Sequence, residues 1–207
     1  AGSVGDALAR GMTSHLTQAL KRPVVVENLP GAGGMTGTAQ LVRAPADGSA
    51  LALVSTSHVI NPFVFKAMPY DPIKDVTPIT VIGKSMMVLV VNPAVPAQNL
   101  AEFVRLLKAS PGKLNYGSSG NGGVTHLPAE MFHREAGVSA RHIPYKGLSA
   151  QVTDIIAGVV EYGFVPVGVA VPQLKAGKLR ALAVTGAVRS PMLSQVPTIK
   201  EGGLASY

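Results

Sequence analysis

Short apolar runs alternate with helical segments along most of this chain, and this alternation is what most constrains its fold. The strand-like runs occupy residues 24–28, 51–55, 86–91, 113–116, 141–144, 159–165 and 179–185. Apolar residues at helical spacing predict helices at residues 6–20, 38–43, 99–108, 125–135, 149–157 and 169–175. Asn99 is a candidate N-cap and Gly158 a candidate C-terminal stop. Alternating strands and helices predict an α/β fold with mostly parallel sheets.

Composition places the chain among globular proteins. Of its 207 residues, 47% are hydrophobic and only 14% are charged, which excludes a disordered chain. The longest fully apolar run, Met86–Val91, is too short to span a bilayer. No cysteine is present, so neither disulfides nor thiolate chemistry contribute. The first six residues lack the features of a signal peptide, which leaves export open because a mature chain would have lost that segment.

A formal charge of +7 makes the chain basic. Lys and Arg are scattered, aromatic residues are only 5%, and no nucleic-acid-binding motif appears, so we expect no nucleic-acid partner. A solvated basic surface explains the charge, and attraction of small anions stays open.

A glycine- and serine-rich turn lies between the predicted strand at 113–116 and the predicted helix at 125–135. It reads Gly-Ser-Ser-Gly-Asn-Gly-Gly-Val-Thr-His over residues 117–126. Backbone N–H groups at a helix start are unpaired, glycines allow close approach, and hydroxyls add donors. The turn therefore suits an anion, and it carries no base, phosphate-binding Lys or metal-ligand set of its own.

Polar side chains also follow other predicted strands at their carboxyl ends. Ser55 and Ser57 follow the run at 51–55, and Tyr145 follows the run at 141–144. In open α/β sheets, ligands bind at this edge. We therefore expect a ligand site built from polar residues at the strand ends: Ser55, Ser57, Ser118, Gly120, Asn121, Gly122, His126 and Tyr145.

Three other kinds of site, for a dinucleotide, for a metal ion and for serine hydrolysis, have only partial signals in the sequence. Residues 31–37 are glycine-rich but lack the register of a dinucleotide fingerprint. His126, Glu130 and His133 would share one helical face and could grip a divalent ion, but we expect no metal and no cofactor; His15, His58 and His142 have no partner at ligand spacing. A serine hydrolase would need the spacing of a nucleophile elbow, which the Gly-Ser letters at 117–120 do not match.

The chain resembles the extracytoplasmic solute receptors of the tripartite tricarboxylate transporters, known as Bug receptors. The matching stretches run in the family's order over nearly the whole chain. They are residues 22–28, 30–34, 46–48, 57–62, 70–72, 114–122, 142–147, 177–185 and 196–198. No stretch is decisive alone, but the ordered set is highly specific.

The resemblance implies a two-lobed, type II periplasmic-binding-protein fold with two crossover strands and a ligand cleft between the lobes. Lobe one would hold residues 1–90 and 187–207, incomplete at both termini, and lobe two residues 91–186. An incomplete lobe one is expected to aggregate or dimerise. The resemblance also implies a carboxylate-binding loop near the N-terminus, which adds Ser3 and Val4 to the expected ligand contacts.

In function, the resemblance implies a periplasmic receptor that captures a small organic carboxylate and delivers it to membrane permease subunits, without catalysis. One alternative stays open. A small α/β hydrolase or transferase could use the turn at Gly117–Gly122 as an anion hole. The absence of a positioned nucleophile and base in the sequence separates the two.

Overall fold

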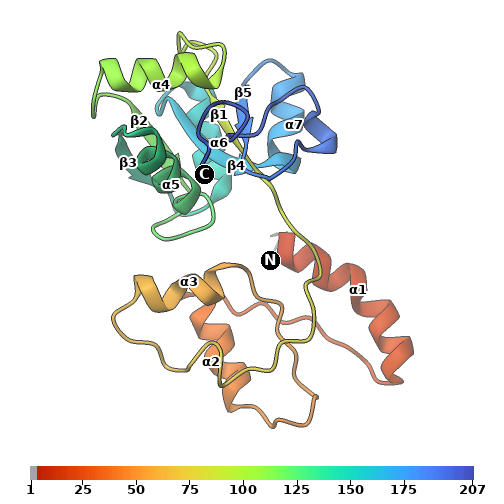
Figure 1. Cartoon of the computed structure of the whole chain (residues 1–207). Coiled ribbons are helices and arrows are strands. Elements are labelled where there is room, and N and C mark those ends of the chain that lie inside the picture. The colour runs from red at the N-terminus through yellow and green to blue at the C-terminus, as the bar shows by residue number, and fades with distance from the viewer. Residues whose placement is uncertain (1–3) are drawn as a thin grey trace. The chain divides into compact units, whose positions relative to one another are not determined.

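The apolar runs in the second half of the chain form one five-stranded sheet (Figure 1). The structure is a computed structural model, and it describes residues 4–207. The strands are β1 (Met87–Val91), β2 (Asn115–Ser118), β3 (Arg141–Pro144), β4 (Tyr162–Pro166) and β5 (Arg180–Val184). They lie in the order β3-β2-β4-β1-β5.

The sheet is mixed: the expected parallel direction holds for β2, β3, β4 and β5, and fails at β1. Strand β2 runs parallel to both β3 and β4, as expected. Strand β1, however, inserts between β4 and β5 and runs antiparallel to both. The first strand of this sheet therefore lies inside the sheet, next to the edge strand β5, and runs in the opposite direction, which adjacent βαβ units alone would not produce.

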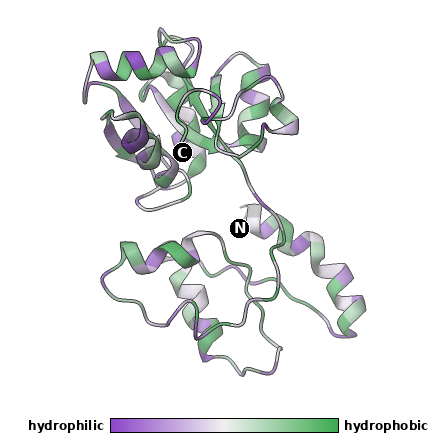
Figure 2. Cartoon of the chain, viewed as in Figure 1, coloured by the Kyte–Doolittle hydropathy of each residue, from purple (hydrophilic) through white to green (hydrophobic). Residues whose placement is uncertain are grey.

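Helices cover both faces of the sheet. The helices are α4 (Leu100–Ala109), α5 (Leu127–Ala136), α6 (Leu148–Ala157) and α7 (Val167–Lys175). All five residues of β1 are buried; alternate ones join the core of α4 and α5, and the others join the core of α6 and α7. In Figure 2, β1 and β5 are mainly hydrophobic, whereas β2 and β3 carry hydrophilic residues.

Local signals in the sequence set the ends of these helices. The Asn99 side chain accepts the Glu102 N–H at 2.9 Å, and its amide donates to the Glu102 carboxylate at 2.7 Å. Asn99 is therefore the N-cap of α4, as predicted. Gly158 ends α6 with a φ of 75°, a left-handed conformation that glycine adopts without strain, so that prediction is confirmed as well.

The first part of the chain folds around helices. The chain divides between Thr80 and Val81 into two compact units. The first contains α1 (Val4–Leu20), a short 3₁₀ turn, α2 (Met35–Arg43) and α3 (Ser57–Val64). No described helix of either unit is long and apolar enough to cross a membrane.

Two strands expected in the first unit are absent, and those predictions are wrong. Within residues 4–80 the structure has no strand, and residues 24–28 and 51–55 form no ladder. Val25 is 87% exposed, although β-branched residues suggested a buried strand. A strand requires a partner for its backbone groups, and propensity alone does not supply one. The helix α3 was not expected.

The C-terminal segment packs on the second unit. Thr198 forms a parallel bridge with Val184, and the Tyr207 hydroxyl donates to the Pro128 carbonyl at 3.2 Å. Leu204 and Tyr207 pack against the core beneath α4 and α5. The assignment of residues 1–90 plus 187–207 to lobe one and of 91–186 to lobe two stays a prediction.

Candidate functional site

The loop at residues 117–126 leaves the carboxyl end of β2 and leads into α5, as the sequence predicted. The helix begins at Leu127, with His126 as its N-cap residue. Gly120 and Gly122 have φ values of 138° and 67°, in the region that favours glycine. The loop therefore takes a path that other residues at these two positions would strain.

Side chains of the loop accept hydrogen bonds from several of its own backbone N–H groups. The Ser119 N–H donates to Thr125 Oγ1 at 2.8 Å, and the Gly122 N–H donates to His126 Nδ1 at 3.0 Å. The Gly123 N–H donates to the Gly120 carbonyl at 3.3 Å. Asn121, at the exposed tip, has no acceptor for its N–H within residues 4–207. The loop is therefore a pre-shaped cradle whose exposed donor is at Asn121.

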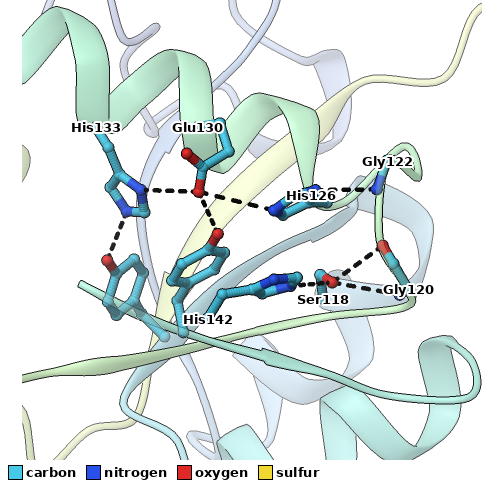
Figure 3. A network of polar contacts seen from close by, with 9 residues as sticks. Ser118, Gly120, Gly122, His126, Glu130, His133 and His142 are labelled. Carbon is cyan, nitrogen blue, oxygen red and sulfur yellow. Dashed lines mark hydrogen bonds and ion pairs between the residues drawn. The ribbon is translucent and has the colours of Figure 1, made fainter. Parts of the chain in front are cut away.

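Ser118 is the most firmly held residue of the loop. It is fully buried, and its Oγ lies 2.6 Å from His142 Nε2. The same hydroxyl lies 3.2 Å from the Gly120 carbonyl and 3.3 Å from the Gly120 nitrogen (Figure 3). One hydroxyl thus joins the end of β2, the first turn of the loop and the neighbouring strand β3.

Aromatic rings stack beneath the loop. His142 is opposite Tyr116 in the parallel register of β2 and β3, and the two ring centroids are 4.8 Å apart with planes 17° from parallel. The His142 ring also stacks on the His126 ring, with centroids 4.0 Å apart and planes 13° from parallel. The Tyr116 and His126 rings are themselves nearly parallel, with centroids 6.2 Å apart. These contacts fix where both imidazoles lie.

Glu130 on α5 joins this stack to the core (Figure 3). The Tyr116 hydroxyl donates to Glu130 Oε1. His126 Nε2 lies 3.7 Å and His133 Nδ1 lies 3.5 Å from the same oxygen. His133 Nε2 in turn lies 2.7 Å from the Tyr162 hydroxyl on β4. A continuous polar network therefore runs from the loop to the middle of the sheet.

The network favours neutral histidines. Burial lowers the pKa of His126, His133 and His142, and the Glu130 carboxylate opposes this shift only partly. Burial by itself raises the pKa of Glu130, but the hydrogen bond from Tyr116 and the nearby His133 outweigh it, and the pKa is lowered. Burial also raises the pKa of Tyr116. At neutral pH the site therefore holds one carboxylate among neutral rings.

The residues weighed as metal ligands do share a face of α5. Both His126 and His133 approach Glu130 Oε1 itself, so these side chains hold one another. Among the described residues, no group of three or more His, Cys, Asp or Glu side chains is arranged to hold a metal ion.

Of the other predicted site residues, Tyr145 lies against the base of the loop. The Tyr145 N–H donates to the Ser118 carbonyl at 2.8 Å, and a Cβ at Gly117 would lie 3.2 Å from the Tyr145 ring. Burial, and next the nearby Asp154, raise the pKa of Tyr145 to about 12. Tyr145 therefore belongs to the same cluster as Ser118.

The remaining predicted site residues belong to the first unit. Ser55 precedes α3 and its Oγ accepts the Ser57 N–H at 3.3 Å; Ser57 is the first residue of that helix. Val4 begins α1, and Ser3 lies outside the described residues. Whether these four contact a ligand stays a prediction.

Sequence reasoning missed His142, Tyr116 and Gln151. His142 has no partner at ligand spacing along the chain, because its partner Ser118 is on a neighbouring strand. The buried Gln151 amide donates to the carbonyls of Gly117 and Phe164, both at 2.9 Å, and so ties α6 to the base of the loop. Alternation along a strand puts Tyr116 and Ser118 on one face, which was the available signal.

The Ser118–His142 pair has the atoms of a nucleophile and a base but not their setting. Ser118 is fully buried, and its hydroxyl contacts Gly120 as well as His142. Within residues 4–207, no carboxylate forms a hydrogen bond with His142. The pair is therefore suited to holding the loop rather than to activating a hydroxyl for attack.

Solved structures define the class of protein. The structure of R. palustris Rpa4515 with adipate is similar with a TM-score of 0.88 and 33% identity, covering 99% of this chain and 70% of that one. The periplasmic binding protein BugD is similar with a TM-score of 0.83 and 31% identity, covering 99% of this chain and 68% of BugD. MatC of Rhodopseudomonas palustris with bound malate is similar with a TM-score of 0.80 and 26% identity, covering 100% of this chain and 71% of MatC. The chain has the α/β fold of periplasmic binding proteins.

Within that class the family is defined by sequence. Residues 8–207 match the tripartite tricarboxylate transporter family receptor, TctC, and the chain belongs to that family. This confirms the resemblance found in the sequence. The protein BugT of Bordetella pertussis is 33% identical over 208 residues, covering all of this chain and 64% of BugT. A protein from the tcbD-tcbE intergenic region of Pseudomonas sp. strain P51 is 32% identical, covering all of this chain and 62% of that protein. The chain thus spans under two thirds of these relatives' length.

Proposed function

We propose that this chain is the ligand-capturing part of a periplasmic receptor that takes up a small organic carboxylate for a tripartite tricarboxylate-type transporter. The strongest support is the similarity, over nearly the whole chain, to family relatives whose structures hold adipate and malate. The carboxylate would then pass to the permease subunits in the membrane. The proposal involves no chemical step; a hydrolase or transferase activity finds no support in the family, whose members are described as receptors.

The loop after β2 is the proposed carboxylate-binding element. Within the second unit, the proposed contacts are Ser118, Gly120, Asn121, Gly122 and Tyr145, and His126 completes the site by holding Gly122 through its Nδ1. Hydroxyls and backbone N–H groups near a helix start carry partial positive charge and can hold an anion without a full countercharge. Ser3, Val4, Ser55 and Ser57 of the first unit are the remaining proposed contacts.

This donor set predicts recognition of the carboxylate group rather than of the whole molecule. None of the proposed contacts is Lys or Arg, and the glycines of the loop present no side chain. Backbone donors bind a carboxylate whatever is attached to it. Other residues must therefore determine which ligand length and substituents are accepted. The excess of positive charge on the chain would favour the approach of any small anion.

Thermal unfolding with a panel of ligands tests the proposal. A ligand that binds only the folded chain raises the free energy of unfolding, by about 2.7 kcal/mol at a ligand concentration a hundredfold above Kd. The midpoint of thermal unfolding rises with it. We expect at least one of a series of short dicarboxylates, including adipate and malate, to raise the midpoint. The matched diamides, which have the same length without the negative charge, should not.

Native mass spectrometry of freshly purified chain supplies the identity of the ligand. We expect one anion per chain that carries a carboxylate and is released on collisional activation. A panel without effect on the unfolding midpoint, together with no retained carboxylate, would contradict carboxylate capture by this chain.

A further inference from the structure

The hydrogen bond between Gly122 and His126 fixes the protonation state of one imidazole nitrogen. The Gly122 N–H donates to His126 Nδ1 at 3.0 Å. A backbone N–H can only donate, so Nδ1 must carry a lone pair and no proton. The proton of the neutral ring is then on Nε2, which faces Glu130 Oε1 at 3.7 Å. Only neutral His126 is compatible with this loop geometry.

A second imidazole holds the other end of the same loop. His142 Nε2 lies 2.6 Å from Ser118 Oγ, and the His142 ring stacks on His126 with centroids 4.0 Å apart. Ser118 and Gly122 bracket the proposed carboxylate-binding residues Gly120 and Asn121. The shape of the loop therefore depends on two imidazoles that also position each other.

We propose that His126 and His142 are positioning residues that hold the Ser118–Gly122 loop in its binding shape, and that protonation of His126 releases Gly122 and weakens carboxylate binding. A proton on Nδ1 replaces an acceptor with a donor, so two N–H groups would face each other at the Gly122 contact. This inference rests on the proposed function for its effect on affinity, whereas the release of Gly122 is a property of the loop alone.

The surroundings of His126 set the direction of the pH response. The titratable groups that face it are Glu130 on α5, Tyr116 on β2 and His142 on β3. His133 on α5 and Tyr162 on β4 lie one step further along the network. Burial lowers the pKa of His126 from its ordinary value of 6.5, and Glu130 raises it by a smaller amount. The ring is therefore neutral above pH 6.5, and the hydrogen bond is lost as the pH falls through the lowered pKa.

Two amide substitutions at position 126 separate the roles of the ring nitrogens. In His126→Asn, the side-chain oxygen lies near the place of Nδ1, accepts the Gly122 N–H and does not titrate. In His126→Gln, the longer side chain reaches toward the place of Nε2 and leaves Gly122 without its acceptor. The Asn variant should keep the hydrogen bond at every pH, and the Gln variant should lack it at every pH.

Hydrogen exchange of the Gly122 amide, followed by NMR, is the first readout and requires no ligand. Corrected for intrinsic exchange, protection in the parent chain should fall about three- to tenfold as the pH is lowered from about 7.5 through the lowered pKa of His126. In His126→Asn it should stay constant, and in His126→Gln it should be low throughout. The exposed His15 on α1 gives the matched control, His15→Gln, which should behave like the parent.

Carboxylate affinity by calorimetry is the second readout. The parent's affinity should fall about three- to tenfold over the same pH range, and the pH dependence should vanish in His126→Asn. At position 142 the ranking should reverse: His142→Gln keeps a group near Nε2 for Ser118 and should bind more tightly than His142→Asn.

The two readouts separate the possible failures. If no carboxylate binds the parent chain, the proposed function fails, and Gly122 exchange still decides whether His126 holds the loop. If Gly122 protection in His126→Gln matches the parent, or if parental protection is independent of pH, the positioning role of His126 is wrong.

Discussion

Replacing Ser118 with alanine is expected to weaken carboxylate binding by about ten- to hundredfold, equivalent to about 1.5–3 kcal/mol. The Ser118 hydroxyl is fully buried and lies 2.6 Å from His142 Nε2, with both backbone polar atoms of Gly120 within 3.3 Å. Its removal takes away the hydroxyl that joins the loop to β3 and leaves the His142 nitrogen without its partner. Calorimetry of the variant and the parent with the same carboxylate measures the effect.

Ser139→Ala is the matched control for this substitution. Ser139 is exposed and lies on the connection between α5 and β3, away from the loop. The affinity and the unfolding midpoint of Ser139→Ala should equal the parent's within error, because surface substitutions usually cost under about 0.5 kcal/mol. Equal affinities for Ser118→Ala and the parent would place the carboxylate site elsewhere.

Replacing Phe103 with alanine is expected to lower the free energy of unfolding by about 3–5 kcal/mol. Phe103 on α4 is fully buried; its ring stacks on Phe132 at 6.3 Å and meets the edge of Tyr162 at 4.9 Å. Truncation leaves a cavity between helices and sheet that the surrounding aromatic rings can only partly fill. Urea unfolding followed by circular dichroism measures the loss.

Met131→Ala is the control on a neighbouring helix. Met131 belongs to α5 but is 55% exposed, so its truncation should change the free energy of unfolding by less than about 0.5 kcal/mol. A loss below about 1 kcal/mol for Phe103→Ala would mean that this aromatic cluster does not carry the stability of the second unit.

The sequence predicts the second unit well because local pattern and packing agree there. Residues 141–144 were expected as a strand and form β3 with the same limits. Asn99 was expected as a cap, and the Glu102 N–H donates to it. These segments pack against the sheet or the core. The secondary structure that their residues favour locally is therefore also the one that tertiary packing stabilises.

In the first unit, the same reasoning fails at residues 24–28 and 51–55. The β-branched residues there favour an extended backbone, but strand formation depends on a partner for each N–H and carbonyl group. That partner is a property of the tertiary structure and leaves no mark in the segment itself. Val25 is accordingly 87% exposed.

The candidate site divides in a similar way. The glycine loop and its position between a strand and a helix follow from residues 117–126 alone. The contact between Ser118 and His142 joins residues on two strands paired in a register that only the folded sheet reveals. The network through Glu130 was visible only as a helical spacing, which suggested a metal as readily as mutual support between side chains.

Titration calorimetry of short dicarboxylates and their diamides tests carboxylate capture most directly. We expect at least one dicarboxylate to bind with one site per chain, and its diamide, which has the same length but no charge, to bind about a hundredfold more weakly or not at all. Binding of the diamide as tight as that of the acid, or no binding by any acid in the series, would contradict the proposal that this chain captures carboxylates.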